Sequence, residues 1–448
     1  MGSLDAEPNV LRIAIVGTGI AGLTAAIALR KLPHVKVELY EKATELKEIG
    51  ASITLGPNGL RTLQRLDLED CISSEVGYRG PNPISRFYRH WKTNEIIGED
   101  FYEDVHEELH YTARFHRGHL QQALLKHVPR DTIHLKKKLV SATLAQEDDG
   151  EVRMEFADGS TAVADLLVGA DGISSGVRQS FAPDFELEWS GHTAFRGIFP
   201  ASLVDDIPGV PLDSTHWWGP DTNFFATRLA RDLFTVQGGI YADPKDEAAI
   251  RKFRDGGQWD KEADIQLLRE KYVDWNPVVK QLSEVCPHVR YYPNYFCGSS
   301  LPTWIFGGRV TLIGDAAHAH GGAFATGGSL AIDDAYALFL SLQTILPPSS
   351  SSSSFPSSSP TIKPSSSQIL AALQLYENTR RPHAVKLLKV VHANNEMKTR
   401  KIITATQETD RELRDRAKRG SNTTWLHEHD VVGAFEEVVR RRKGEDGR

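Results

Sequence analysis

The chain has 448 residues, of which 40% are hydrophobic and 25% are charged, so it is long enough to bury two sizeable cores. Its formal net charge of −7 excludes the basic surface with which proteins bind nucleic acids or anionic membranes. The three cysteines, Cys71, Cys286 and Cys297, form no C-x-x-C pair, and so they indicate neither a metal site nor a disulfide framework.

The N-terminal residues lack the basic and apolar segments of a secretory signal. No apolar run in the sequence is long enough to span a bilayer. We therefore expect a soluble, cytoplasmic protein.

The first recognisable feature is a β-α-β unit. Apolar, β-branched runs at residues 11–16 and 35–40 predict two buried parallel strands, and an Ala- and Leu-rich helix is expected over residues 23–31. A G-x-G-x-x-G motif joins the first strand to this helix, and an acidic residue ends the second strand. The residues of this unit that we expect to contact a ligand are Gly17, Gly19, Ile20, Ala21, Gly22, Glu41 and Lys42.

This unit predicts a dinucleotide site. Gly17 allows a tight turn, Gly19 lets the backbone approach a pyrophosphate, and Gly22 lets the helix pack closely on the strand. The helix N-terminus offers free N–H groups to phosphates. Glu41 can accept hydrogen bonds from a ribose and would repel the 2′-phosphate of NADP. The motif alone leaves FAD, NAD and an unliganded glycine turn open.

The remaining elements predict a second, sheet-based unit inserted into the first. In chain order we expect a helix over 111–127, hairpins over 136–168 with a turn at Asp158-Gly159, strands at 192–199 and 233–240, a buried strand over 309–313, and helices over 329–346 and from 369 onward. Residues 347–367 are mostly Ser and Pro, which cannot offset their ordering entropy, so we predict a disordered surface loop.

Several motifs together resemble those of FAD-dependent aromatic hydroxylases, the class A flavoprotein monooxygenases. VGADGISSGVR at 168–178 resembles their DG motif, and GRVTLIGDAAH at 308–318 resembles their second FAD motif. Arg117 matches the arginine before the first sheet crossover, and residues 50–58 resemble the loop beside the flavin. Residues 376–382 and 425–430 resemble C-terminal features of the salicylate hydroxylase branch.

The resemblance implies an α/β fold of the p-hydroxybenzoate hydroxylase type. Such a fold has an FAD-binding, Rossmann-like domain, an inserted β-sheet substrate domain and C-terminal helices. The expected segments are FAD-binding parts at 9–80, 111–185 and 301–346, substrate-domain parts at 81–110 and 186–300, the loop at 347–367, and C-terminal helices and tail at 368–448.

The resemblance also implies the chemistry. FAD would be the resident cofactor, with NADH or NADPH as a transient co-substrate and O₂ as the oxidant, and a flavin C4a-hydroperoxide would hydroxylate a phenolic or other electron-rich aromatic compound. Decarboxylation could accompany this step. The sequence contains no second G-x-G-x-x-G unit for the nicotinamide cofactor and suggests no metal site.

Further cofactor contacts follow from the same resemblance. Asp315, after Gly314, would hold the ribityl chain or a neighbouring phosphate or hydroxyl group, and Arg117 would contact the pyrophosphate. Gly327 and Gly328 would let the backbone approach the isoalloxazine, beside the loop that contains Ala51 and Ser52. Asp171 would be tied to phosphate and nicotinamide handling. A helix-capping role for Asp171 remains an equal alternative.

The substrate side rests on fewer residues. Arg196 falls where several relatives carry a substrate-facing arginine, and it could hold a phenolate or carboxylate or instead form a structural ion pair. Candidate ring-facing residues, with plain core positions as the alternative, are Trp217, Trp218, Phe224 and Phe225. His320 lies in a loop with glycines where relatives usually have proline. We expect a solvent-facing histidine there, with a proton relay or a substrate contact as the alternative.

Two alternatives stay open. The first is a biosynthetic flavin monooxygenase of secondary metabolism that performs epoxidation or dearomatisation. The second is a non-catalytic flavin-binding or redox-sensing protein, since fold does not determine function. The absence of a W-x-W-x-I-P segment argues against a flavin halogenase.

Overall fold

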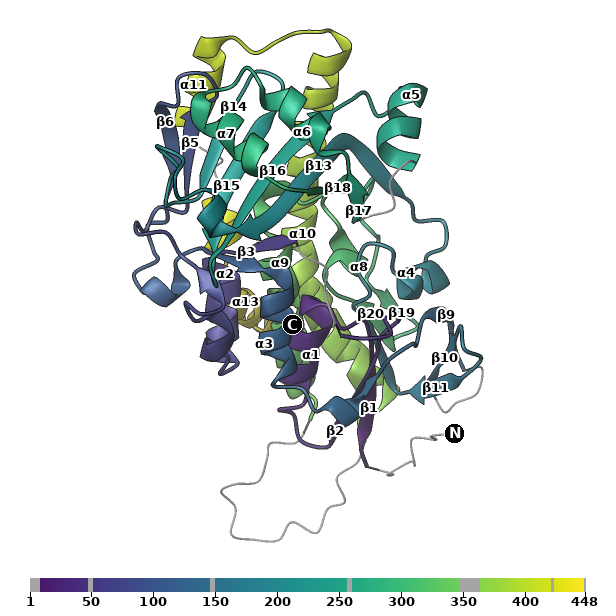
Figure 1. The fold of residues 1–448 in the computed structure, drawn as a ribbon. Coiled ribbons are helices and arrows are strands. Elements are labelled where there is room, and N and C mark those ends of the chain that lie inside the picture. Colours follow the sequence, from purple (N-terminus) through teal and green to yellow (C-terminus); the bar gives the residue numbers. More distant parts are fainter. Residues whose placement is uncertain are drawn as a thin grey trace.

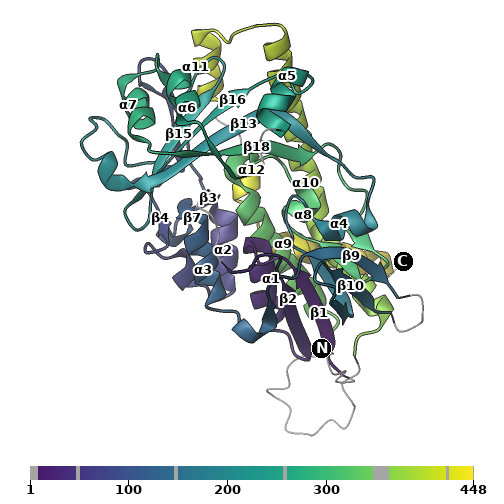
Figure 2. The ribbon, with the colours of Figure 1, turned by 45° about the vertical axis from the view of Figure 1, so that its right-hand side comes forward.

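The computed structural model describes residues 9–46, 51–145, 150–255, 260–346, 363–419 and 423–446. A mostly parallel sheet and its helices occupy the lower half of Figure 1, and an eight-stranded sheet occupies the upper half. Helix α10 (Ser366–Ile403) runs alongside both halves (Figure 2). Its Lys398 donates to the Tyr241 hydroxyl of the upper sheet at 3.3 Å.

The lower sheet is built around β1, whose six residues are all buried. Its strand order is β19 (Ile305–Phe306), β20 (Val310–Leu312), β12 (Leu166–Gly169), β1 (Leu11–Val16), β2 (Val35–Tyr40) and β8 (Ile133–His134). Only β19 pairs in the antiparallel sense. Parallel strands are apolar on both faces and need cover on each.

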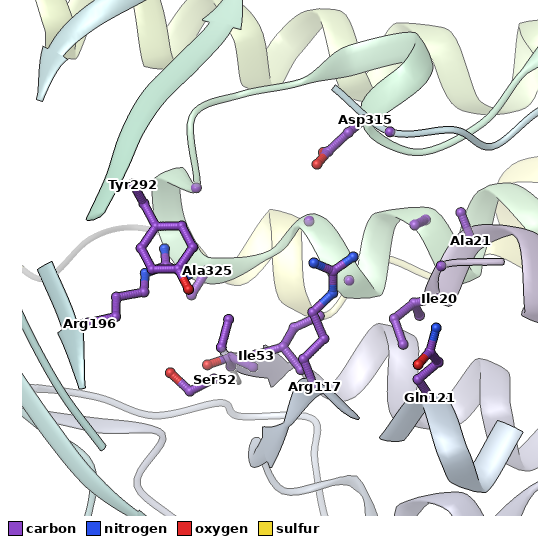
Figure 3. Close-up of a pocket in the computed structure, with 18 of the residues that line it drawn as sticks. Ile20, Ala21, Ser52, Ile53, Arg117, Gln121, Arg196, Tyr292, Asp315 and Ala325 are labelled. Carbon is purple, nitrogen blue, oxygen red and sulfur yellow. The ribbon is translucent and has the colours of Figure 1, made fainter. Parts of the chain in front are cut away.

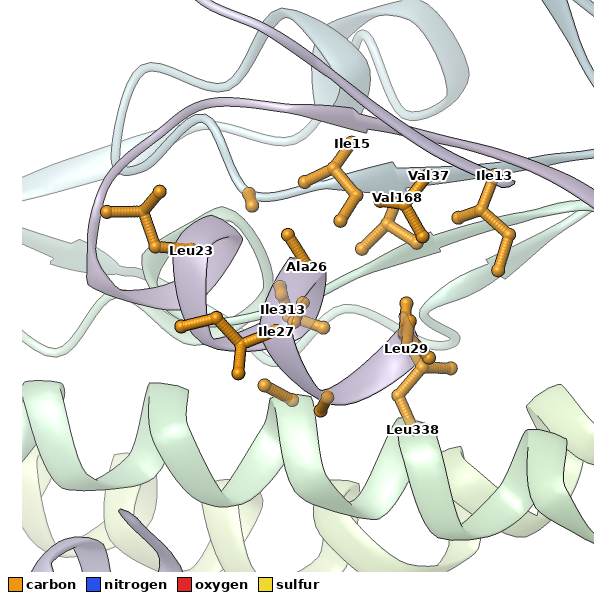
Figure 4. Close-up of a cluster of buried hydrophobic side chains, with 14 of the residues drawn as sticks. Ile13, Ile15, Leu23, Ala26, Ile27, Leu29, Val37, Val168, Ile313 and Leu338 are labelled. Carbon is orange, nitrogen blue, oxygen red and sulfur yellow. The ribbon is translucent and has the colours of Figure 1, made fainter. Parts of the chain in front are cut away.

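Helices and a small sheet provide that cover. Side chains of β1, β2 and β12 pack against α1 (Ile20–Leu29), which packs in turn on α9 (Gly327–Gln343) (Figure 4). An antiparallel sheet of β9 (Leu139–Leu144), β10 (Val152–Phe156) and β11 (Thr161–Ala164) adds Met154 and Phe156 to the same core. This core holds the carboxyl ends of the parallel strands in fixed positions.

The upper sheet contains strands from distant parts of the chain. Its order is β17 (Lys261–Ala263), β18 (Val289–Cys297), β13 (Leu187–Pro200), β16 (Leu233–Tyr241), β15 (Asn223–Leu229), β14 (Thr215–Trp218), β5 (Arg86–His90) and β6 (Ile96–Asp100). All neighbours are antiparallel except β14 and β5. Helices α6 (Ile265–Tyr272) and α7 (Pro277–Val285) supply Leu268, Tyr272 and Leu282 to a second core on one face.

A three-stranded sheet lies where the two halves meet. Its order is β3 (Ser52–Leu55), β7 (Ala113–His116) and β4 (Gly77–Tyr78). Strand β7 contacts β15 of the upper sheet, and β3 contacts α9 of the lower half. The remaining α-helices are α2 (Pro57–Arg65), α3 (Arg117–Leu125), α4 (Gly176–Phe181), α5 (Glu247–Ala249), α8 (Asp315–His318), α11 (Asp410–Lys418), α12 (Thr424–His427) and α13 (Val431–Asp446).

The β-α-β unit is confirmed: both strands have the predicted bounds, and the helix begins slightly earlier, at Ile20, with Gly19 as its N-cap. The helix predicted over 111–127 is wrong in its first part. Residues 113–116 form β7, because pairing with β3 on one edge and β4 on the other overrides the local helical preference. Helix α3 then begins at Arg117.

The Ser- and Pro-rich loop falls at 347–362 outside the described residues. The following helix begins at Ser366, where Ser365 and Gln368 form a capping box. Gly50, in the loop expected beside the flavin, also lies outside the described residues. Across the ranges that the structure covers, no helix combines the length and apolar character needed to cross a membrane.

Candidate functional site

A cavity of about 560 Å³ lies between the carboxyl ends of the parallel strands and the upper sheet. Ligands of open α/β sheets bind at this edge of the strands. Ile20 and Ala21 line one end of the cavity, and Arg196 and Tyr292 lie at the other (Figure 3). The predicted site residues that line it are Gly19, Ile20, Ala21, Glu41, Ala51, Ser52, Arg117, Arg196, Asp315, Gly327 and Gly328.

The other predicted cofactor residues do not line the cavity: Gly17, Gly22, Lys42, Asp171 and Gly314. The three glycines shape its walls. Gly17 has φ +106°, and a Cβ there would lie 2.8 Å from the carbonyl carbon of Ala170. A Cβ on Gly22 would collide with the Gly17 carbonyl oxygen, so close helix–strand packing requires glycine here. Lys42 is exposed.

The start of α1 forms the first end of the cavity. A Cβ built on Gly19 meets no atom closer than Nη2 of Arg117 at 3.8 Å, so the space in front of this helix N-terminus is open. Oε2 of Glu41 accepts hydrogen bonds from the Thr18 N–H at 3.0 Å and the Thr18 hydroxyl at 2.7 Å. Glu41 therefore fixes the glycine turn in addition to facing the cavity.

Asp171 caps a helix in this structure. Its Oδ2 accepts hydrogen bonds from the N–H groups of Gly176 at 2.7 Å and Val177 at 3.2 Å, at the start of α4. Burial raises the pKa of this carboxyl group. These contacts support the capping alternative for Asp171.

The middle of the cavity combines charge with close backbone approach. Arg117 and Asp315 point into it from opposite sides (Figure 3). Helix α9 begins here, and a Cβ on Gly328 would lie 2.7 Å from Cδ1 of Ile53. The Arg117 guanidinium and the N-termini of α1 and α9 suit the phosphates of a dinucleotide, and the Asp315 carboxylate suits its hydroxyl groups.

One face of the upper sheet forms the far wall. In the strand register, Arg196 pairs with Gln237, Gln237 with Phe225, and Phe225 with His216. All four line the cavity. Because directly paired residues share a face of a sheet, the row runs continuously across β13, β16, β15 and β14.

Neighbouring residues of a strand face opposite sides of the sheet, so only some of the four aromatic candidates can line the cavity. Phe225 lines the cavity, whereas its neighbour Phe224 points into the second core with Trp217, and both of these rings are fully buried. Trp218 packs on Tyr88, with ring centroids 4.2 Å apart, and does not line the cavity. For Trp217 and Phe224, the core alternative is correct.

Arg196 stacks on an aromatic ring. Its guanidinium carbon lies 5.1 Å from the ring centroid of Tyr292, and burial lowers its pKa. Its Nε has no hydrogen-bond partner. Among the residues that the structure describes, no carboxylate forms an ion pair with Arg196, so the structural ion pair is not seen there.

His320 is buried, and the expectation of a solvent-facing histidine is wrong. An isolated bridge to Phe296 of β18 draws its loop under the upper sheet, where His320 lines the cavity with 2% of its surface exposed. Neither ring nitrogen has a hydrogen-bond partner. Burial lowers its pKa to about 4, so the ring is neutral at pH 7.

Several cavity residues carried no recognisable sequence signal. They are Arg86, Arg114, His216, Gln237 and Tyr292. They come from five strands of two different sheets, and only contacts between segments far apart in the chain bring them together. The only sequence feature that could have identified them is a basic or polar residue inside a strand of otherwise alternating pattern.

The family described as "FAD binding domain" matches residues 10–204 and 299–370, which is more than half of the chain. The chain belongs to this FAD-binding family. Its cofactor is therefore FAD, which fits the cation, the carboxylate and the helix N-termini of the cavity.

Curated relatives are aromatic monooxygenases. The chain is 29% identical to 6-hydroxynicotinate 3-monooxygenase of Bordetella bronchiseptica over 87% of this chain and 92% of that one. It is 29% identical to a salicylate hydroxylase of Pseudomonas putida over 73% of this chain and 76% of that one. The resemblance of this FAD-binding protein to aromatic hydroxylases of the salicylate hydroxylase type is confirmed.

Solved structures agree in fold. A salicylate hydroxylase substrate complex superposes with a TM-score of 0.74 at 23% identity, covering 96% of this chain and 98% of that one. HpxO of Klebsiella pneumoniae, in complex with FAD and uric acid, superposes with a TM-score of 0.67 at 20% identity, covering 96% and 97%. The α/β fold of the p-hydroxybenzoate hydroxylase type is confirmed, whereas the exact segment boundaries remain predictions.

Proposed function

We propose that this flavoprotein is a monooxygenase that consumes NADH or NADPH and inserts one oxygen atom of O₂ into a hydroxylated aromatic acid. The observation that carries the proposal is a cavity that extends without interruption from the FAD-binding edge of the lower sheet to the polar and aromatic row of the upper sheet. An aromatic ring placed on that row would lie beside the cofactor.

The chain's own residues would hold FAD at three places. The N-terminus of α1 and the Arg117 guanidinium would bind the pyrophosphate. The Asp315 carboxylate would accept a hydrogen bond from a hydroxyl of the ribityl chain. The start of α9 at Gly327 would place the positive end of a helix dipole near the flavin ring. Bound FAD supplies the electron transfer and the oxygen activation.

The substrate ring would be held by neighbouring side chains. Phe225 offers an apolar face, and Arg196 offers a cation that stabilises a phenolate. The neutral ring of His320 can accept a hydrogen bond from a phenol, because neither nitrogen is otherwise engaged. Phenolate formation would make the ring more electron-rich and therefore more reactive toward an electrophilic oxygen.

Substrate class is proposed from the relatives. The relatives are named for their action on hydroxynicotinate, salicylate, 6-methylsalicylate and aminohydroxybenzoate. All of these carry a carboxylate on a small aromatic ring. We expect this chain to act on an aromatic acid as well, with oxygen insertion either alone or with loss of CO₂.

The direct test is turnover by the FAD-loaded protein. Purified protein is incubated in air with NADH or NADPH and salicylate, 6-hydroxynicotinate or larger phenolic acids, and product mass is read. A gain of one oxygen supports hydroxylation, and a gain of oxygen with loss of CO₂ supports the decarboxylating reaction. Absence of nicotinamide oxidation with every acid would count against a monooxygenase and favour flavin binding without catalysis.

A further inference from the structure

Two arginines lie together in the wall of the cavity, away from Arg196. Arg86 belongs to β5, and Arg114 belongs to β7. Both line the cavity. Nη2 of Arg114 donates to the carbonyl oxygen of Ser85 at 2.8 Å, which brings its guanidinium beside the backbone next to Arg86. Neither residue belongs to a recognised cofactor motif.

The two cations differ in how they are compensated. Burial alone would lower the pKa of Arg86, but Tyr88, Asp100 and Tyr102 outweigh this effect, so its pKa is raised. Arg86 therefore has acidic neighbours that hold it in the charged form.

Arg114 is compensated less than Arg86. Tyr88 and Tyr102 raise its pKa, but burial and the charge of Arg86 outweigh them. Arg114 is 2% exposed, and its Nε and Nη1 have no hydrogen-bond partner. In the described ranges no carboxylate forms an ion pair with it, and burial together with the charge of Arg86 lowers its pKa to about 9. A buried guanidinium with unused donors is costly, and an anion placed in the cavity would satisfy it.

The surroundings suit an aromatic anion. His216 lines the cavity here, and burial, with smaller effects from Arg86 and Arg114, lowers its pKa well below the ordinary value, so it adds no charge. The His216 ring centroid lies 4.6 Å from that of Phe225. An aromatic wall therefore adjoins two cations.

The register separates this pair from Arg196. Strand β5 lies four strand spacings from β13 in the upper sheet, about 19 Å at the usual interstrand distance. Arg114 pairs instead with Thr54 of β3, which lines the cavity next to Ser52 and Ile53. The arginine pair thus adjoins the loop expected beside the flavin, and its β5 member is separated from Arg196 along the upper sheet.

We infer that Arg114, assisted by Arg86, binds the carboxylate of the aromatic substrate. This inference rests on the proposed function. It assigns the carboxylate to the arginine pair and not to Arg196. Arg guanidinium groups suit this role because they bind carboxylates through two parallel hydrogen bonds.

The test is equilibrium binding to the FAD-loaded protein, followed by the change in flavin absorbance without NAD(P)H. The probes are 6-hydroxynicotinate, 4-hydroxycinnamate and 6-hydroxy-2-naphthoate, each paired with its neutral carboxamide. We expect at least one acid to bind about ten-fold or more tightly than its carboxamide. Arg114→Met should abolish this preference, and Arg86→Met should reduce it.

Arg89→Met is the matched control. Arg89 lies on the same strand as Arg86, donates to the Asn94 carbonyl oxygen at 2.8 Å and does not line the cavity, so this variant should keep the preference. FAD content and melting temperature are measured for every variant. Should Arg114→Met fail to fold, Arg86→Met and Arg114→Lys carry the test, since the lysine retains charge but loses the second hydrogen bond.

Three results would overturn the inference. One is equal binding of acid and carboxamide by the unaltered protein for all three pairs. Another is loss of the preference in Arg196→Met but not in Arg114→Met. The third is an Arg114→Met effect confined to the KM for NADH or NADPH, which would assign the anion to the nicotinamide cofactor. The first two results are read without turnover and the third requires that turnover occurs, so each is distinguishable from failure of the monooxygenase reaction itself.

Discussion

Asp334 of α9 accepts a hydrogen bond from Nε2 of His318 at 2.6 Å, although both side chains are almost fully buried. The same Oδ2 accepts from the Gly314 N–H at 2.9 Å, and Oδ1 accepts from Nε of Arg380 in α10 at 2.8 Å. One carboxylate therefore ties the segment that carries Asp315 to two long helices. Interaction with His318 and Arg380 outweighs burial and holds the pKa of Asp334 well below its ordinary range.

Asp334→Asn should destabilise the fold and weaken FAD binding. The substitution leaves Arg380 without its anionic partner in a buried site, which costs about 3 kcal/mol or more. The neighbouring variant Asp333→Asn is the control, because the hydrogen-bond partners of Asp333 are the neutral Asn58 and Thr62, and burial outweighs the charge of Arg380 and raises the pKa of this carboxyl group. Urea unfolding and FAD titration check both variants. Equal losses would contradict the anchoring role of Asp334.

Alanine substitutions at two glycines of the first motif should affect FAD binding and stability differently. Gly17→Ala introduces a Cβ at φ +106° and close to Ala170, so we expect loss of FAD together with a lower melting temperature of the apoprotein. Gly19→Ala has an allowed φ of −69° and projects its Cβ into the open cavity. Its apoprotein should be within about 0.5 kcal/mol of the unaltered protein.

FAD affinity then separates the two causes. We expect Gly19→Ala to raise the FAD Kd about ten-fold or more, because the added methyl group occupies the space of the pyrophosphate. Calorimetry of the apoprotein and fluorescence titration with FAD measure the two quantities. Unchanged FAD affinity in Gly19→Ala would show that the cofactor does not approach this helix start.

The sequence predicted what depends on local order. The first β-α-β unit and the Gly314-Asp315 segment follow short motifs whose spacing reflects backbone geometry within one unit. The wall of the upper sheet could not be predicted in this way. Arg196, Gln237 and His216 become neighbours only through strand register, which joins segments far apart in the chain.

The errors have the same origin. Strand β7 was predicted as helix because its two partner strands are distant in sequence. His320 was expected in solvent because nothing local shows that β18 covers its loop. Arg114 belongs to no recognisable sequence motif. Only the structure shows that two of its donors are unpaired and that it lies near Arg86. Long-range packing decided each of these positions.

Phe224→Ala and Phe225→Ala should differ although the residues are adjacent. Phe224 is fully buried in the second core, so its truncation should cost about 3–5 kcal/mol of stability. Phe225 faces the cavity, so its truncation should cost below about 2 kcal/mol while raising the KM for the aromatic substrate. Urea unfolding and steady-state kinetics test the pair. A larger stability loss for Phe225→Ala would contradict the assigned faces of β15.

Because His320 is buried, the free energy of unfolding should decrease at acidic pH. Burial lowers its pKa from 6.5 to about 4, an effect that the neighbouring His318 adds to and Asp315 partly offsets. Between these pH values the unfolded chain binds more protons than the folded one, so stability is full above pH 6.5 and falls as the pH decreases toward 4. At about 1.4 kcal/mol per pH unit, the loss by pH 4.5 is about 2.5 kcal/mol.

His320→Gln removes this contribution. Urea unfolding of the apoprotein at pH 7 and at pH 4.5 should give a smaller difference for the variant than for the unaltered protein, by about 2.5 kcal/mol. Burial lowers the pKa values of several other histidines in the same way, and their contributions persist in both proteins, so comparison of the two differences isolates His320. These other histidines include His119, His192, His216, His383, His427 and His429. An identical difference in both proteins would mean that His320 is protonated as readily in the folded chain as in the unfolded one, and its role as a neutral acceptor in the cavity would have to be abandoned.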